Sequence, residues 1–211
     1  MKTFLITAGP TIEPIDPVRY ISNYSTGEMG YALAVAAKKR RNKVVLISGP
    51  TALKPPKGIK FIPVKTAFEM RRAVLRHFRG ADCVIMTAAV ADFRPADFSG
   101  EKLKKGTKKE YFLRLLRNPD ILSELGKRKG SKVLVGYSLE TDNHMENTRS
   151  KMKSKNLDLI VANKAGKLSS PFGKGKKDLT IISRKSGRTA FKAVSKEKIS
   201  HILLDKIEVL W

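Results

Sequence analysis

The stretch from Phe4 to Ala37 constrains the fold more than any other part of the chain. An apolar run at residues 4–8 is typical of a buried strand, and a Gly-Pro turn follows it at once. A polar loop comes next, and a helix rich in small residues then opens at Gly27 and Gly30. In α/β proteins, the segment between a first strand and a helix N-terminus is where phosphates bind. The sequence therefore predicts an α/β fold with a ligand site at this point.

Apolar runs alternate with helical patterns along the rest of the chain, which is typical of a mostly parallel sheet with helices on both faces. Pro63 in the run 60–64 indicates an edge strand. A hairpin around Ser186-Gly187 and a helix capped by Ser195 are expected at the C-terminal end. Further strands are expected at residues 43–48, 82–87, 111–116, 132–138 and 157–162. We predict a Rossmann-like fold in which residues 1–211 form one domain.

Other helices are expected at about 28–41, at 66–80 with a Thr66–Glu69 capping box, and at about 142–155. Asn118 is expected to cap a further helix, with Pro119 at its first position. Residues 93–109 and 166–177 are rich in Lys, Gly and Pro, so loose loops are expected there.

The net charge of +24 is spread through the chain. Residues 1–100 carry 16 basic and 7 acidic side chains, and residues 101–211 carry 27 and 12. Nucleic-acid binding, polyanionic substrates and an organism with generally basic proteins all explain such an excess. No RNA-binding aromatic motif, zinc finger or helix-turn-helix pattern favours the first.

No apolar run approaches membrane-spanning length, and the single Cys83 predicts a cytoplasmic location.

Several common chemistries lack their motifs. Neither GxGxxG after the first strand nor GxxxxGK[ST] is present, and the three histidines are scattered. Cys83 lies in an apolar strand, where a thiol is usually inert. Catalysis is therefore expected to proceed by positioning and electrostatic stabilisation, without an enzyme nucleophile.

Four segments are candidates for the site, and each has a plainer interpretation. Residues 23–30 lead into a helix either as a phosphate site or as a plain cap by Ser25 or Thr26, with the glycines allowing close helix–strand packing. Residues 88–95 follow a buried strand, where Asp92 would hold a hydroxyl or metal, or pair with Arg94 at the surface. The run 101–105 is a lysine-bearing lid or a solvated charge cluster. Lys151 and Lys155 lie four residues apart on one helix face and would repel each other unless an anion bridges them.

Together these segments resemble the phosphopantothenoylcysteine synthetase family. The matching stretches are ITAGPT, IDPVRYISNYSTGEMG, VVLISGP, TAAVADFRP, EKLKK, NPDI, GYSLET and KNLDLIVAN, in the family's order. In many bacteria this module follows a flavin-dependent decarboxylase domain. Because nothing precedes the first strand, the sequence resembles a stand-alone synthetase with a separate decarboxylase as its pathway neighbour.

The resemblance implies a ligase of coenzyme A biosynthesis. The bacterial enzymes activate 4′-phosphopantothenate with CTP and Mg²⁺ to an acyl-cytidylate and pyrophosphate, and the amine of L-cysteine then displaces CMP. Family members are dimers, with the lysine loop near the subunit interface. A nucleic-acid-binding α/β module, suggested by the charge, remains the alternative. The residues themselves do not distinguish CTP from ATP.

The resemblance also implies roles for particular residues. Asn23 would contact the pantothenate carboxyl or the acyl-cytidylate, and Arg19 would help to hold phosphopantothenate. Lys102 would act on the phosphates and in the cysteine-dependent half-reaction. Tyr137 stands where the family usually has Phe, and its ring face is retained. The remaining nucleotide-binding positions would be Met86, Thr87, Ala88, Asp92, Asn118, Pro119, Asp120, Ile121, Lys151 and Lys155, and no metal ligand is assigned.

Overall fold

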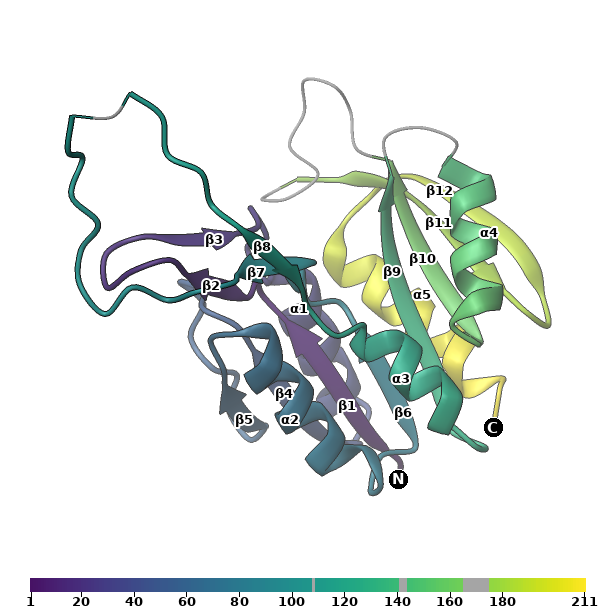
Figure 1. Cartoon of the computed structure of the whole chain (residues 1–211). Coiled ribbons are helices and arrows are strands. Elements are labelled where there is room, and N and C mark those ends of the chain that lie inside the picture. The colour runs from purple at the N-terminus through teal and green to yellow at the C-terminus, as the bar shows by residue number, and fades with distance from the viewer. Residues whose placement is uncertain (108, 141–143, 165–174) are drawn as a thin grey trace.

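The computed structural model describes residues 1–107, 109–140, 144–164 and 175–211. An eight-stranded sheet has the order β12-β11-β10-β9-β6-β1-β4-β5, with β1 (Thr3–Ala8) in its interior (Figure 1). The other strands are β4 (Lys43–Ser48), β5 (Lys60–Pro63), β6 (Cys83–Met86), β9 (Val133–Glu140), β10 (Leu159–Lys164), β11 (Lys177–Ser183) and β12 (Gly187–Val194). The pairings from β5 to β10 are parallel, and β11 and β12 add an antiparallel hairpin.

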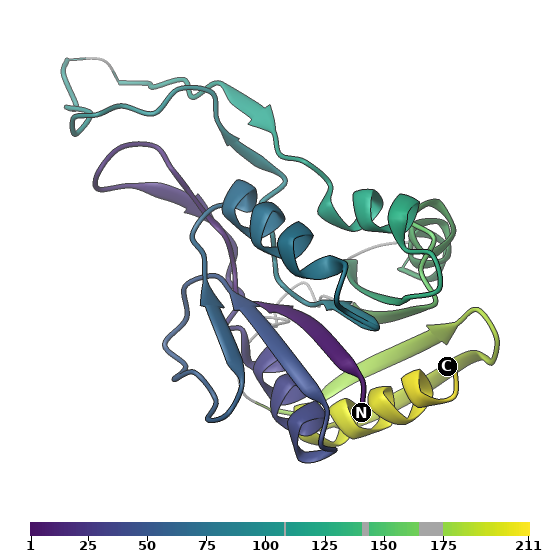
Figure 2. The same cartoon turned by 90° about the horizontal axis from the view of Figure 1, so that it is seen from below.

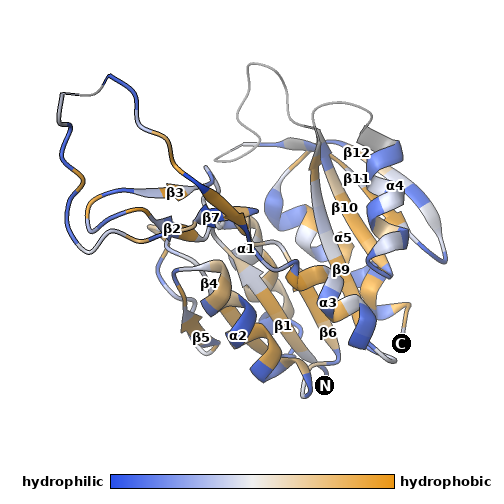
Figure 3. Ribbon diagram, in the orientation of Figure 1, coloured by the Kyte–Doolittle hydropathy of each residue, from blue (hydrophilic) through white to orange (hydrophobic). Residues whose placement is uncertain are grey.

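Helices cover both faces of this sheet (Figure 2). On one face, α1 (Glu28–Lys39) and α5 (Lys196–Glu208) pack over strand side chains such as Phe4, Ile6 and Leu46. The other face packs against α2 (Ala67–Phe78), α3 (Ile121–Arg128) and α4 (His144–Ser154). The interior strands are apolar in almost continuous runs because both of their faces are buried (Figure 3). The predicted Rossmann-like α/β class is confirmed.

Several local predictions are confirmed by side-chain contacts. Strand β5, which ends at Pro63, lies at an edge of the sheet. Thr66 caps α2 by accepting a hydrogen bond from the Glu69 amide at 3.2 Å. Ser195 caps α5 in the same way through the Lys198 amide, also at 3.2 Å. These caps are local in sequence, which is why spacing alone finds them.

Two short hairpins were not expected. Strands β2 (Ile12–Pro14) and β3 (Tyr20–Ser22) pair with each other, as do β7 (Phe93–Pro95) and β8 (Leu115–Arg117). Both hairpins lie outside the main sheet, where they extend from one side of the molecule (Figure 1). The strand predicted at 111–116 is therefore wrong at its start, and the predicted loop 93–109 begins with a strand.

The predicted cap of α3 is also wrong. Asp120, two residues after Asn118, is the N-cap, and its carboxylate accepts from the Ser123 amide at 2.9 Å. Asn118 instead donates its side-chain amide to the Ala91 carbonyl at 2.9 Å, which leaves Pro119 outside the helix. Of the second predicted loop, residues 166–174 lie outside the described residues, and Lys177 already belongs to β11. Residues 142–143 of the helix predicted at 142–155 are likewise not described.

Candidate nucleotide and substrate site

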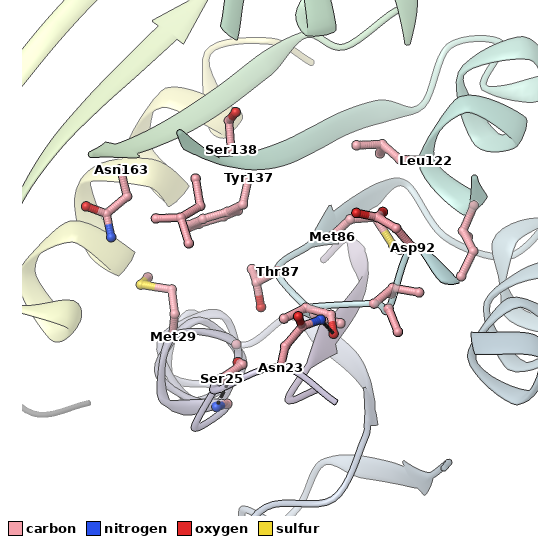
Figure 4. Close-up of a pocket in the computed structure, with 18 of the residues that line it drawn as sticks. Asn23, Ser25, Met29, Met86, Thr87, Asp92, Leu122, Tyr137, Ser138 and Asn163 are labelled. Carbon is pink, nitrogen blue, oxygen red and sulfur yellow. Dashed lines mark hydrogen bonds between the residues drawn. The ribbon is translucent and has the colours of Figure 1, made fainter. Parts of the chain in front are cut away.

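The site lies between β1 and β6, where the order in which the chain adds strands to the sheet reverses. The chain runs from β1 to β4 on one side and from β6 to β9 on the other, so the carboxyl ends of β1 and β6 border the crevice that open α/β sheets use for ligands. A cavity of about 750 Å³ opens there (Figure 4). Its lining includes residues 23–30, residues 86–93 and the segment from Arg117 to Leu122.

Short hydrogen bonds join the two strand ends. The Thr87 hydroxyl donates to the Thr7 carbonyl at 2.6 Å, and the Ala88 amide donates to the Thr7 hydroxyl at 3.2 Å. Past the strands, the Ala89 amide donates to the Gly9 carbonyl at 2.9 Å. These contacts continue the pairing beyond the sheet, so the cavity floor is fixed by backbone and small side chains.

Helix α1 begins at the cavity without a side-chain cap. Its N-cap is Gly27, in a left-handed conformation with φ of 78°, which a residue with a Cβ adopts only with strain. Gly30 has a different role: a Cβ there would lie 2.5 Å from the Ala8 Cβ and 2.7 Å from the Thr87 hydroxyl. Gly30 therefore allows α1 to approach both strands. The predicted cap by Ser25 or Thr26 is wrong, because Gly27 is the N-cap, whereas the close helix–strand packing expected of the glycines is confirmed at Gly30.

Asn23 lies at the rim of the cavity, and its side-chain amide donates to the Ala89 carbonyl at 2.9 Å. This bond crosses from the loop before α1 to the segment after β6 (Figure 4). Asp92 is exposed beside it, and its backbone carbonyl accepts from the Asn118 amide at 2.8 Å. Asn23 and Asp92 thus face the same space from two elements.

The opposite wall combines a helix N-terminus with lysines. Asp120 pairs with Lys155 at 2.7 Å, and Lys151 also lines the cavity. Burial alone would raise the pKa of Asp120, but the Lys155 contact and the nearby Lys151 charge lower it. The carboxylate of Asp120 therefore offsets part of the repulsion between the two lysines that a bound anion would otherwise have to offset.

Tyr137 extends from β9 toward Met29 on the remaining side (Figure 4). Its hydroxyl is buried and makes no hydrogen bond to any residue of the described chain. Burial raises the pKa of this phenol. The ring supplies an apolar surface on this side of the cavity.

Twelve of the fourteen expected site residues line this cavity, and Arg19 and Lys102 do not. Instead, the Arg19 guanidinium donates a hydrogen bond of 2.8 Å to the Leu103 carbonyl. Leu103 directly follows Lys102, whose side chain is exposed. The twelve are Asn23, Met86, Thr87, Ala88, Asp92, Asn118, Pro119, Asp120, Ile121, Tyr137, Lys151 and Lys155.

Two buried carboxylates were not singled out from the sequence. Glu13 is 2% exposed and accepts from the Ala67 amide at 2.9 Å, at the start of α2. The pKa of Glu13 is raised, because burial outweighs the hydrogen bonds from Ala67, Thr11 and Asn118, which lower it. Asp16 is 3% exposed and pairs with Arg19. Both lie in the polar loop that follows the first strand, where the sequence does not show which carboxylates become buried.

In the part of the chain that the structure describes, no three His, Cys, Asp or Glu side chains gather as a metal site. In the same residues, no helix is long and apolar enough to span a bilayer. The cavity lining includes the N-terminus of α1 and the lysines Lys151 and Lys155, and backbone N–H groups and ammonium groups both suit a phosphorylated ligand.

Comparison with known proteins identifies the family. Residues 1–210 match the model of the DNA/pantothenate metabolism flavoprotein C-terminal domain. The coenzyme A biosynthesis bifunctional protein CoaBC of Bacillus subtilis is 45% identical over 210 residues, which cover 99% of this chain and 52% of that protein. CoaBC of Escherichia coli K12 is 40% identical over 206 residues, covering 96% and 50%. This chain thus spans about half the length of both relatives.

Solved structures agree. A crystal structure of the C-terminal domain of CoaBC superimposes with a TM-score of 0.84 at 36% identity, covering 99% of this chain and 95% of that one. A Cab2 mutant in complex with phosphopantothenate-cysteine has the same fold, with a TM-score of 0.78 at 17% identity and coverage of 99% and 87%. The family resemblance inferred from the sequence is confirmed: this chain belongs to the DNA/pantothenate metabolism flavoprotein C-terminal domain family.

Proposed function

We propose that this chain is a phosphopantothenate–cysteine ligase of coenzyme A biosynthesis, with residues 1–211 as its synthetase domain. The observation that carries the proposal is the cavity at the ends of β1 and β6, which gathers twelve of the residues that the family resemblance assigns to binding. The names of the CoaBC relatives and the ligand of the Cab2 structure support the same reaction.

The proposed reaction has two steps. A carboxylate oxygen of 4′-phosphopantothenate attacks the α-phosphorus of CTP, forms an acyl-cytidylate and releases pyrophosphate. The cysteine amine then attacks the acyl carbon, forms the C–N bond, loses a proton and expels CMP. Asn23 would orient the acyl group, and Lys102 would offset negative charge on the transferring phosphates.

The remaining lining residues would bind the nucleotide. The uncapped start of α1 and the α3 N-terminus present backbone N–H groups suited to phosphate oxygens. Lys151 and Lys155 would add positive charge, and the Tyr137 ring would contact the base. We propose that CTP is the nucleotide, bound with Mg²⁺.

The chain's donors fit Mg²⁺ only as part of a nucleotide complex. Asp92 and Asp120 line the cavity singly, and Asp120 already pairs with Lys155. A magnesium ion usually keeps several waters and takes one or two carboxylates together with phosphate oxygens. When bound, it would offset triphosphate charge that the lysines leave uncompensated.

Activation is expected to occur without cysteine, because the two half-reactions are chemically separable. CTP, Mg²⁺ and 4′-phosphopantothenate alone should give about one pyrophosphate per site and a bound acyl-cytidylate. Rapid-quench assays with each nucleoside triphosphate in turn measure this burst. Pyrophosphate release that strictly requires cysteine contradicts the proposed order of steps. If none of the nucleoside triphosphates gives pyrophosphate, the proposed function is wrong.

The nucleic-acid alternative gains no support from the relatives described above. Arg40 pairs with Asp205 and Glu208, and Arg71 pairs with Glu124, but these pairs use acidic residues that the net charge of +24 already counts, so they do not reduce the basic excess. A salt-dependent gel shift with a steep slope would be the result that favours this alternative.

We infer that the ligase is a homodimer joined through its two hairpins. Tyr20, Phe93, Leu115 and Leu116 on these hairpins are 58%, 46%, 43% and 41% exposed, and apolar β8 stands out from the body (Figure 3). Contiguous exposed apolar side chains are typical of protein interfaces.

Sedimentation velocity should give twice the 23.5 kDa chain mass. Leu116→Lys should shift the protein toward monomer, and a monomeric wild type contradicts the inference.

A cytoplasmic location and a separate decarboxylase that acts on the product remain predictions. Cys83 is buried, and burial raises the pKa of its thiol, as expected of an inert cysteine in the core. The decarboxylase prediction rests on the family resemblance, and the proposed product would retain the cysteine carboxylate that such an enzyme removes.

A further inference from the structure

Asp16 is the most heavily hydrogen-bonded side chain of the two hairpins. Its carboxylate is fully buried and accepts from the Val18 and Arg19 amides at 2.8 and 2.7 Å. The other oxygen accepts from the Arg19 guanidinium and, at 3.1 Å, from the Leu103 amide. The paired guanidinium is the main reason that the pKa of Asp16 lies well below its usual range, so the charge is permanent near neutral pH.

Arg19 completes a closed arrangement around Leu103. The guanidinium that binds Asp16 also donates to the Leu103 carbonyl at 2.8 Å. Both backbone groups of Leu103 are therefore held by one ion pair, the N–H by Asp16 and the carbonyl by Arg19. Residues 16, 19 and 103 in this arrangement are called the clasp below.

The clasp fastens the long loop between β7 and β8 to the turn between β2 and β3. A further hydrogen bond of 3.0 Å, from the Ser99 amide to the Ile15 carbonyl, ties the same two segments together. Lys102 is the residue directly before Leu103, and its side chain is exposed. Beyond the clasp, the loop extends away from the body (Figure 1).

We propose that Asp16 and Arg19 are positioning residues that set the place of Lys102 by fixing the backbone at Leu103. This inference rests on the proposed ligase function and on the role given there to Lys102. A lysine on a flexible stem meets a transferring phosphate productively only if its backbone starts from a defined point. Arg19 thus serves the reaction through the loop, in place of the substrate contact that the family resemblance implies.

The clasp itself is tested in the free protein, by amide hydrogen exchange of residues 99–103. Asp16→Asn retains the size of the side chain but removes the charge and one acceptor, so exchange at Leu103 should become faster. Asp97→Asn is the matched control, because Asp97 pairs with Arg114 in the same loop with both side chains 74% or more exposed. Unchanged exchange at Leu103 in Asp16→Asn overturns the clasp, whatever reaction the protein catalyses.

The positioning role is tested by kinetics. Arg19→Lys keeps the positive charge on a half-exposed side chain, so the fold is not at risk, but one ammonium does not reproduce the two-sided contact. We expect Arg19→Lys and Asp16→Asn each to lower kcat about 10- to 100-fold with little change in the KM for 4′-phosphopantothenate. Asp97→Asn should retain the wild-type kcat.

A double-mutant cycle with Lys102→Gln separates positioning from substrate binding. If Arg19 acts through Lys102, Arg19→Lys should cause no further loss when Lys102 is already glutamine. Independent, multiplicative losses, or a raised KM for 4′-phosphopantothenate at unchanged kcat, would make Arg19 a substrate ligand and overturn the proposal. Absence of pyrophosphate release in the wild type would overturn the ligase function instead, and the exchange result would still stand.

Discussion

Replacing Lys102 by glutamine is expected to lower turnover by about two orders of magnitude or more, with only a modest change in CTP affinity. The side chain is exposed and lies outside the cavity lining, so it contributes little to ground-state binding. A lysine whose side chain reaches the phosphates as negative charge develops on them stabilises the transition state more than the bound substrate. Loss of one such charge typically costs ~3 kcal/mol of transition-state stabilisation.

Lys104 and Lys105 are the matched controls for this prediction. Both are exposed and lie in the same loop, one and two residues beyond Leu103. Their glutamine variants change the local charge equally but lie past the point that the clasp holds. Steady-state kinetics on the three single variants decide the matter. Equal losses in all three, or a Lys102→Gln variant that only raises the KM for CTP, would make the run a general electrostatic patch.

The main sheet could be predicted because its signals are local and strong. Interior strands such as β1 and β6 are buried on both faces, so each appears as an unbroken apolar run. The Thr66 and Ser195 caps follow from residue type and spacing alone. The two outlying hairpins have strands of three residues and contain prolines, so they carry no alternation pattern that the sequence could reveal.

The α3 cap shows where local rules fail. Asn118 before Pro119 has the expected form of a cap, but the Ala91 carbonyl and Arg94 bind its side chain, and Asp120 caps the helix instead. The competing partners are 27 and 24 residues away in the chain, so no short window of sequence contains the competition.

Most residues of the site could be predicted from the sequence, but the contacts between them could not. The family resemblance selected twelve residues that the fold brings to one cavity, from segments as far apart as Asn23 and Lys155. It did not reveal that Asp16 and Arg19 together hold the backbone of Leu103, because contacts of residues 16 and 19 with residue 103 depend on the tertiary fold. Glu13 and Asp16 were missed for the same reason: a buried carboxylate is recognised by its partners, which the sequence does not display.

Asn23→Asp is expected to reduce turnover about 100-fold while leaving the folded protein nearly as stable as the wild type. The side chain is exposed, and its amide donates to the Ala89 carbonyl at 2.9 Å. An aspartate has no donor for that carbonyl, and it would place negative charge beside the substrate carboxylate. The lost hydrogen bond is worth about 0.5–1.5 kcal/mol at most, which corresponds to a small fall in melting temperature.

Asn42→Asp is the control for the added charge. The Asn42 side chain accepts a hydrogen bond from the Lys2 amide at 3.0 Å, a role that aspartate keeps, and it lies outside the cavity lining. Thermal unfolding and single-turnover rates on both variants separate catalysis from folding. Activity per folded molecule should fall in Asn23→Asp alone. A large fall in its melting temperature with unchanged activity per folded molecule would make Asn23 a structural link between the loop before α1 and the segment after β6, because only the Ala89 contact would then explain its presence.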